Sequence, residues 1–219
     1  EAGSGNDYID GVGEIHAGAG NDTIKAKGRS EVYGDEGNDT IYLGNGTSSN
    51  PSAITANGGL GDDTYIAQST NGFDTLFANE GNDVIKILNV SADSISMYKK
   101  GNDVVIQRPS STSDIGSLLI LKDYYSNEKK YGENKDKTAK ELFDNWTVET
   151  YSGELGSAKR ASFDLADFID YVSGNMNIIN SGIGYSGDDM IEASTTVRII
   201  DGKGGNDNII AGQHTKTIN

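Results

Sequence analysis

Residues 58–66 have the composition of a turn that binds a hard cation. They read Gly-Gly-Leu-Gly-Asp-Asp-Thr-Tyr-Ile, a complete unit of the form G-G-x-G-x-D-x-U-x in which U is a large apolar residue. Glycines allow positive φ angles and leave their carbonyl groups bare, and Asp63 adds a carboxylate beside them. Because the turn offers carbonyl and carboxylate oxygens but no nitrogen or sulfur side chain, it suits a hard divalent cation, above all Ca²⁺. The residues that follow predict a short strand with one apolar side chain pointing inward.

Other stretches within the first 90 residues repeat this unit, intact or in part. A single Gly-Asn-Asp triplet would carry little weight, whereas several copies in so short a segment are a strong repeat signal. Aligned on their aspartates, the copies have turns that end at Asp7, Asp22, Asp39, Asp63, Asp74 and Asp83.

The spacing of the aspartates predicts how the turns stack. Turns of the main series, Asp7, Asp22, Asp39, Asp63 and Asp83, are 15, 17, 24 and 20 residues apart. Two nonapeptides make one coil of a β-roll, so turns about 18 residues apart lie on the same edge. We therefore expect one calcium-rich edge with about four sites between successive turns, and an opposite edge on which only Asp74 keeps its aspartate. The inward apolar ladder would consist of Ile9, Ile15, Ile24, Val32, Ile41, Tyr65, Leu76 and Ile85.

The nonapeptide resembles the repeat of the RTX (repeats-in-toxin) proteins, a calcium-binding parallel β-helix repeat. The resemblance implies an all-β fold: a calcium-bound parallel β-roll, or β-solenoid, with a β-rich cap, two short helices and a second short β-roll segment. It also implies that aspartate carboxylates and turn carbonyls from two successive turns hold each ion. In the first array the ligands would come from Gly3, Gly5, Asp7, Gly18, Gly20, Asp22, Gly34, Gly37, Asp39, Gly58, Gly59, Gly61, Asp63, Asp74, Gly81 and Asp83, the turn at Asp74 lacking two of the glycines.

The motif returns in the C-terminal part of the chain. Asp189 and Asp207 are 18 residues apart, the spacing of stacked turns, so one further calcium site is expected between them. By the same resemblance, its ligands would come from Gly187, Asp189, Gly202, Gly205 and Asp207. We therefore divide the chain into a calcium-binding β-roll (1–86), a capping and linker region (87–175) and a second, truncated β-roll segment (176–219).

The capping region is expected to contain strands and two helices. A hairpin with a Lys-Gly-Asn turn at 100–102 assigns Asp103 to the hairpin and not to calcium, and a third strand is predicted at 118–121. This succession resembles the segment after the repeats in haemolysin-like RTX proteins, which closes the open end of the roll. A capping box of Thr138 and Glu141 predicts a helix over 138–146, and an apolar face predicts another over 162–172.

Composition favours folding that depends on a cation. The formal net charge is -15 and 35% of the residues are hydrophobic. Carboxylates gathered at turns repel one another until a cation lies between them, so we expect the calcium-free chain to be largely disordered. The sequence has no cysteine and no apolar run long enough to span a membrane, and its acidity argues against nucleic acid as a partner. It begins inside a repeat, which reads as a fragment of a longer array.

No pattern in the sequence indicates an enzyme. A G-x-G-x-x-G match at 182–187 runs directly into a calcium repeat and lacks the flanking strand and helix of a dinucleotide site. His16 and His214 are the only histidines, and they do not provide the residues for a zinc site or a Ser-His-Asp triad. The paired carboxylates already have an explanation in their period, so a glycosidase site is not indicated. We expect this chain to have no catalytic activity.

The RTX resemblance implies a secreted bacterial protein that uses type I secretion machinery and folds on meeting extracellular calcium, with affinities of roughly 10⁻⁴ to 10⁻³ M. Three functions stay open: a module of a haemolysin-like cytotoxin, part of a large surface adhesin, and the secretion tail of an exported hydrolase. The haemolysin-like cap favours the cytotoxin, whose expected partner is a host-cell surface receptor and whose expected location is extracellular or at the host membrane. An acylation and pore-forming region would mark the toxin, long tandem domains the adhesin, and a zinc or serine-hydrolase motif the enzyme.

Overall fold

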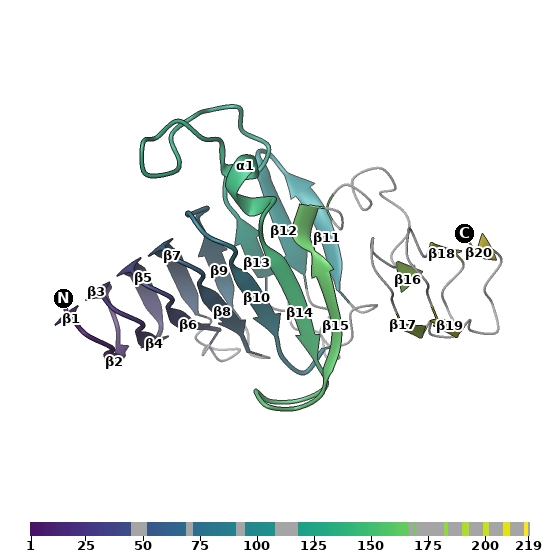
Figure 1. Ribbon diagram of the computed structural model, residues 1–219, viewed down its shortest axis with the longest axis horizontal. Coiled ribbons are helices and arrows are strands. Elements are labelled where there is room, and N and C mark those ends of the chain that lie inside the picture. Colours follow the sequence, from purple (N-terminus) through teal and green to yellow (C-terminus); the bar gives the residue numbers. More distant parts are fainter. Residues whose placement is uncertain are drawn as a thin grey trace.

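The first ten strands wind between two parallel sheets that face each other. The computed structural model describes residues 1–44, 52–68, 72–90, 95–107, 118–166 and 169, followed by short strands between residues 182 and 218. Consecutive strands alternate between the sheets, and each coil pairs in parallel with the next, which is the predicted β-roll (Figure 1). Sheet A contains β1 (Gly3–Ser4), β3 (Glu14–Ala19), β5 (Arg29–Glu36), β7 (Ala53–Leu60) and β9 (Phe73–Leu76), and sheet B contains β2 (Tyr8–Gly11), β4 (Thr23–Ala26), β6 (Thr40–Leu43), β8 (Thr64–Ala67) and β10 (Val84–Ile87).

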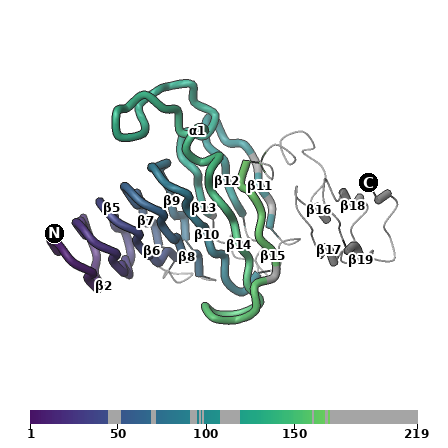
Figure 2. Tube along the Cα trace, in the orientation of Figure 1, coloured from purple at the N-terminus to yellow at the C-terminus, as the bar shows by residue number. Residues whose placement is uncertain are grey.

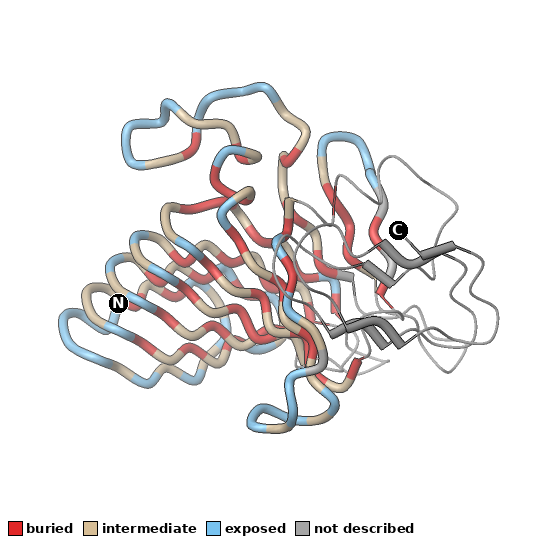
Figure 3. Tube along the Cα trace, turned by 45° about the vertical axis from the view of Figure 1, so that its right-hand side comes forward, coloured by how far each residue is buried: buried red, intermediate tan, exposed pale blue. Residues whose placement is uncertain are grey.

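Apolar side chains fill the space between the sheets. Burial alternates along most strands of the roll, with a buried residue at every second position of β4, β6, β9 and β10, for example (Figure 3). In sheet B, Ile24, Ile41 and Tyr65 are register partners and are fully buried. Each fully buried side chain of this size stabilises the fold by roughly 1.5–3 kcal/mol relative to an exposed one. The predicted ladder is confirmed, except that Ile9, in the first complete coil, is only partly buried.

A second inward column was not predicted. It consists of residues two positions after a ladder residue in the same strand: Ala17, Ala26, Leu43 and Ile87. Ile54 and Ala56 are also buried, in β7, for which no inward residue was predicted, and Ala56 pairs in register with Val32 and Leu76 of the ladder. The sequence motif specifies one apolar position after each aspartate, whereas each strand is long enough to place a second side chain inward.

Both sheets continue past the last coil into a cap. Sheet A is extended by β13 (Leu118–Leu121), which pairs in parallel with β9, and then by the antiparallel strands β12 (Asp103–Gln107) and β11 (Ser96–Lys100). Sheet B is extended by β14 (Thr147–Tyr151), parallel to β10, and by the antiparallel β15 (Lys159–Asp164). Figure 2 traces the chain through this cap. The predicted hairpin and third strand are confirmed, whereas the contribution of β14 and β15 was not predicted.

One helix of the cap agrees with the sequence and one does not. The helix α1 (Ala139–Phe143) begins with the expected capping box of Thr138 and Glu141 and buries Ala139, Leu142 and Phe143. The helix predicted over 162–172 is wrong at its start, because β15 continues to Asp164 and pairs with β14. Leu165, Ala166 and Ile169 are helical. Pairing with an available strand outweighs a local helical pattern here.

The short C-terminal strands are parallel as well. β17 (Met190–Glu192) pairs with β19 (Asn208–Ile210), and β18 (Ile199–Asp201) pairs with both β16 (Gly182–Ile183) and β20 (Thr217–Ile218), each partner 18 residues away in register. The predicted ligands Gly187, Asp189, Gly202, Gly205 and Asp207 lie outside the described residues. Within the described part of the chain, no helix has the length and apolar character needed to cross a membrane.

Candidate calcium-binding edge

Five aspartates stack at one edge of the roll and bond to one another's backbone. We call Asp7, Asp22, Asp39, Asp63 and Asp83 the carboxylate column. Each N–H donates to Oδ1 of the aspartate one coil further along, at 2.7 Å for Asp7 to Asp22, 2.7 Å for Asp22 to Asp39, 2.9 Å for Asp39 to Asp63 and 2.8 Å for Asp63 to Asp83. The predicted stacking of these five turns on one edge is therefore what the structure shows.

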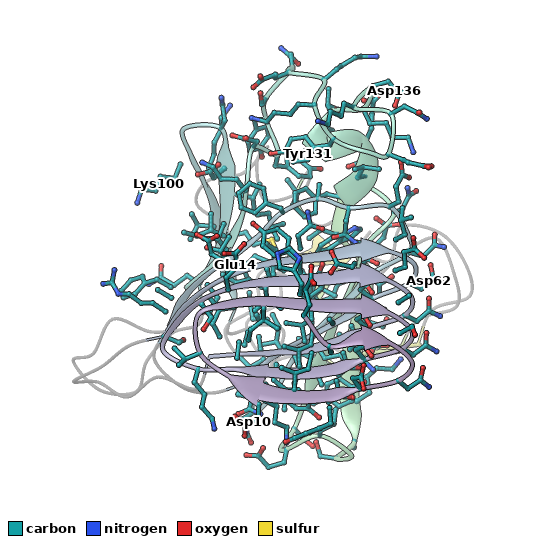
Figure 4. All side chains as sticks on the ribbon, turned by 90° about the vertical axis from the view of Figure 1, so that its left-hand side faces the viewer. Asp10, Glu14, Asp62, Lys100, Tyr131 and Asp136 are labelled. Atoms are coloured by element: carbon teal, nitrogen blue, oxygen red, sulfur yellow. The ribbon has the colours of Figure 1, made fainter. Side chains whose placement is uncertain are left out.

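The residue before each aspartate forms a second ladder that runs in the opposite direction. Here the side-chain oxygen of one coil accepts from the backbone N–H of the next, at 2.8 Å from Asn21 to Asn6, 2.9 Å from Asn38 to Asn21, 2.9 Å from Asp62 to Asn38 and 2.8 Å from Asn82 to Asp62. Asp62 lies at the outer edge of its coil (Figure 4). These residues were not predicted as functional, although the recurring Gly-Asn-Asp triplet carried the signal.

Two carboxylates of the column have an oxygen without a partner. Asp22 and Asp39 are each 1% exposed, and their Oδ2 atoms are buried with no hydrogen-bond partner among the described residues. A buried carboxylate without compensation is costly in its charged form. Accordingly, burial raises the pKa of Asp39 to about 6, and the charges of Asp22 and Asp35 add to the effect. A cation between the turns would supply the missing partner.

The turn glycines bring backbone oxygens close to these carboxylates. A Cβ built on Gly34 would lie 2.2 Å from Oδ2 of Asp39 and 2.3 Å from the carbonyl oxygen of Gly58, so a carboxylate oxygen of one turn adjoins a carbonyl oxygen of the next. Gly37 has a φ of +129°, and its Cβ would lie 1.9 Å from the carbonyl oxygen of Gly20, which only glycine can accommodate. The predicted glycines stack likewise in two columns, Gly3, Gly18 and Gly59 in one and Gly5, Gly20, Gly37, Gly61 and Gly81 in the other.

Asp35 interrupts the first glycine column. Register pairs it with Gly18 on one side and Gly59 on the other, and it has the positive φ of its neighbours, +72°. Its side chain points outward to Nδ1 of His16, 3.4 Å away. Since positive φ is strained for a residue with a Cβ, the stacked turn evidently imposes this conformation.

No group of three or more histidine, cysteine, aspartate or glutamate side chains within the described ranges is arranged to hold a metal. The groups near the buried Asp39 carboxylate include backbone carbonyl oxygens, so a cation at this edge would have both kinds of oxygen nearby. This is the oxygen-rich ligand set that Ca²⁺ prefers, and it fits the position of Asp39 Oδ2 and the Gly58 carbonyl oxygen beside Gly34.

Asp74 and Asp103 lie away from the carboxylate column. Asp74 is in sheet A, where its Oδ1 accepts from the backbone of Ile54 at 2.9 Å and from Ser52 Oγ at 3.2 Å. Burial raises the pKa of Asp74 to about 6. Asp103 accepts from Lys122 Nζ at 3.2 Å and from the backbone of Asp123 at 2.9 Å, in keeping with its assignment to the hairpin.

The last turn of the column contains a buried asparagine that was not predicted. Asn79 is 5% exposed, and its Nδ2 donates to Asp63 Oδ2 at 3.0 Å and to Asp83 Oδ2 at 2.8 Å. The hydroxyl of Tyr65 donates to Asn79 Oδ1 at 2.8 Å and accepts from Gly58 N–H at 2.8 Å. Burial raises the pKa of Asp63 to about 7 and that of Asp83 to about 8.

A family model of the RTX calcium-binding nonapeptide repeat matches the chain in 4 copies, over residues 16–48 and 68–86. The chain contains RTX calcium-binding repeats. The matched segments include the turns at Asp22, Asp39, Asp74 and Asp83, and RTX nonapeptide repeats bind calcium ions.

The chain is similar to the solution structure of a subunit of the mannuronan C5-epimerase of Azotobacter vinelandii, with 17% sequence identity, a TM-score of 0.30, and coverage of 71% of this chain and 83% of that one. None of the curated proteins matches the RTX-containing chain.

Proposed function

We propose that this RTX chain is a folding module whose first roll forms when calcium ions bind between its stacked turns. The observation that carries the proposal is the pair of buried Oδ2 atoms of Asp22 and Asp39, which have no partner in the described part of the chain. Buried carboxylates in adjacent turns repel one another, and a divalent cation converts that repulsion into attraction. The ion therefore contributes directly to the free energy of folding.

The ligands would come from pairs of neighbouring turns. In the gap between Asp39 and Asp63, Asp39 Oδ2 and the Gly58 carbonyl oxygen both lie beside Gly34. The gaps between Asp7 and Asp22 and between Asp22 and Asp39 repeat the aspartate ladder and the close contact of the stacked glycines Gly5, Gly20 and Gly37. The bound ion would supply positive charge, and the chain's own contribution is to hold the carbonyls and carboxylates at one edge.

The proposal extends to the parent protein. We assign it to a secreted bacterial cytotoxin of the haemolysin-like kind that is exported by type I secretion machinery, binds a host-cell surface and folds outside the cell. The acidic chain, the absence of cysteine from its sequence and the calcium-dependent repeats support export in an unfolded state. The parent protein should lyse host cells in millimolar calcium and not in chelator, and calcium-dependent adhesion without lysis would favour the adhesin instead.

The folding proposal is tested by circular dichroism and by counting bound calcium. Millimolar calcium should convert a largely disordered chain into β structure; an unchanged strand content would contradict the proposal. Asp39→Asn keeps an acceptor for the Asp22 N–H but removes the charge, so it should lower the calcium count by at least one ion per chain. Asp103→Asn makes the same chemical change in the hairpin and serves as the control, because it should leave the count unaltered. Equal counts in the two variants would mean that the ions lie elsewhere.

A further inference from the structure

Asn79 occupies a position that a glycine or Asp35 fills in the preceding turns. The bridge between Leu60 and Glu80 aligns the last two turns, so Asn79 corresponds to Gly59. Gly59 has a φ of +107°, whereas Asn79 does not adopt a positive φ. The changed backbone directs the asparagine side chain into the turn, in contrast to the outward side chain of Asp35.

The amide of Asn79 lies between two carboxylates of adjacent coils. Oδ1 of Asp63 and of Asp83 each accept a backbone N–H, which leaves Oδ2 of each for another partner. Asn79 Nδ2 donates to both of these Oδ2 atoms, at 3.0 and 2.8 Å. One neutral amide therefore provides the two contacts that an ion would otherwise make with these carboxylates.

Tyr65 determines the orientation of the Asn79 side-chain amide. Its hydroxyl accepts the Gly58 N–H, so its own proton is free to go to Asn79 Oδ1. With the amide oxygen on Tyr65, the NH₂ group must face the carboxylates. Tyr65 is fully buried and stacks on Trp146 of the cap at 5.1 Å between ring centroids, which holds the hydroxyl in place.

The gap between Asp39 and Asp63 differs from the gap between Asp63 and Asp83 in the partners of its carboxylate oxygens. Oδ2 of Asp39 has no partner within the described ranges and adjoins the Gly58 carbonyl, whereas Oδ2 of Asp63 and of Asp83 are both satisfied by Asn79. We infer that Asn79 takes the place of a calcium ion in the gap between Asp63 and Asp83, so that this last gap of the column binds no calcium. The inference rests on the proposed calcium sites in the preceding gaps. It reduces the expected sites of the first array from about four to about three, and it joins the last coil to the roll by hydrogen bonds alone.

The test counts calcium in the unmodified chain and in two variants, by atomic emission after equilibrium dialysis. Asn79→Asp replaces the amide donor by a third carboxylate, so the gap should require a cation and the count should rise by one ion per chain. Asn102→Asp makes the same chemical change at an exposed position in the hairpin turn between β11 and β12, away from both ladders of the calcium-binding edge, and it should bind the same number of ions as the unmodified chain.

Folding of the variants is checked by circular dichroism in calcium. If Asn79→Asp does not fold, Asn79→Gly restores the residue type of position 59, and it too should gain one ion. Equal counts in the unmodified chain and in the variant that folds would overturn the inference. An unmodified chain that binds no calcium would overturn the proposed function instead.

A second measurement needs only the unmodified chain. In saturating calcium, the Asn79 side-chain NH₂ should give a proton signal that exchanges slowly with water, because both protons are hydrogen-bonded to buried carboxylates. Asn79→Gly assigns that signal by removing it. Fast exchange in calcium would mean that an ion has displaced the amide, and the inference would be abandoned.

Discussion

Removing the hydroxyl of Tyr65 should destabilise the roll although it removes no apolar contact. Tyr65→Phe keeps the ring, its complete burial and its stacking on Trp146. It deletes one oxygen that accepts the Gly58 N–H and donates to Asn79 Oδ1, both at 2.8 Å. The substitution therefore isolates the polar link between the apolar core and the carboxylate column.

The change in the free energy of unfolding depends on the two groups that lose their partner, the Gly58 N–H and Asn79 Oδ1. A buried donor or acceptor that loses its partner costs about 1–3 kcal/mol, and Tyr65→Phe leaves one of each. Partial relaxation of the Asn79 amide lowers the total, so we expect the free energy of unfolding to fall by roughly 2–4 kcal/mol. This is a large part of the net stability of an ordinary domain, about 5–15 kcal/mol.

The assay is urea unfolding in saturating calcium, followed by the fluorescence of Trp146, the only tryptophan of the chain. Tyr42→Phe is the matched control: Tyr42 lies in β6, the strand next to β8, and its ring faces outward under Lys25 Nζ at 4.9 Å. The control should change the free energy of unfolding by less than about 0.5 kcal/mol, as is usual for surface substitutions. If Tyr65→Phe is as mild as Tyr42→Phe, the hydroxyl network does not contribute as argued.

Two further predictions concern the turns. Gly37→Ala should destabilise the calcium-bound roll by about 3–5 kcal/mol, because the strain of a positive φ adds to the 1.9 Å approach of the new Cβ to the Gly20 carbonyl oxygen. Gly5→Ala is the control: Gly5 has a similar φ but nothing within 4 Å of its Cβ position, so this change should cost only about 1–3 kcal/mol. Equal losses of unfolding free energy in urea would contradict the contact between coils. In chelator, β structure measured by circular dichroism should decrease as the pH rises from about 4 to about 8. Burial raises the pKa values of Asp63 and Asp83 from 3.8 to about 7 and about 8, so the folded calcium-free chain retains protons that the unfolded chain releases, and its stability is lost as those groups ionise. More β structure at pH 8 than at pH 5 would be the opposite result.

The period of the aspartates was sufficient to predict the β-roll. Asp22, Asp39 and Asp63 stack because each turn has a glycine two residues before its aspartate and each following strand has a large apolar residue two positions after it, so one local pattern specifies the arrangement many times. The hairpin of the cap was predictable for a similar reason, since Gly101 marks a turn between two alternating segments. The strand β15 was not, because its pairing with β14 depends on an edge that only the assembled sheet provides.

Asn79 shows the limit of reading repeats by their shared residues. In the aligned repeats, the turn that ends at Asp83 is a degenerate copy that lacks one glycine, and the sequence alone indicates no role for the asparagine at that position. Its contacts with Asp63 and Tyr65 arise only when two coils are stacked, and they span 16 and 14 residues of sequence. The signal that could have revealed it is the tyrosine at position 65, where the other turns of the column are followed by isoleucine at the same place.

The uneven spacing of the aspartates also has a structural explanation. On the carboxylate edge, the first four turns that join sheet A to sheet B have the same length, residues 5–7, 20–22, 37–39 and 61–63, and residues 81–83 follow the bridge between Leu60 and Glu80 in the same register. The connections on the opposite edge vary: in register, residues 12–13 of one coil correspond to residues 27–30 of the next, and a longer insertion at 44–52 follows. The two opposed ladders require each turn to match its neighbour residue by residue, because a shift of one position would break both sets of N–H···O bonds. Extra residues can therefore enter only at the edge that has no such ladder, and the calcium-binding geometry stays constant while the coil length changes.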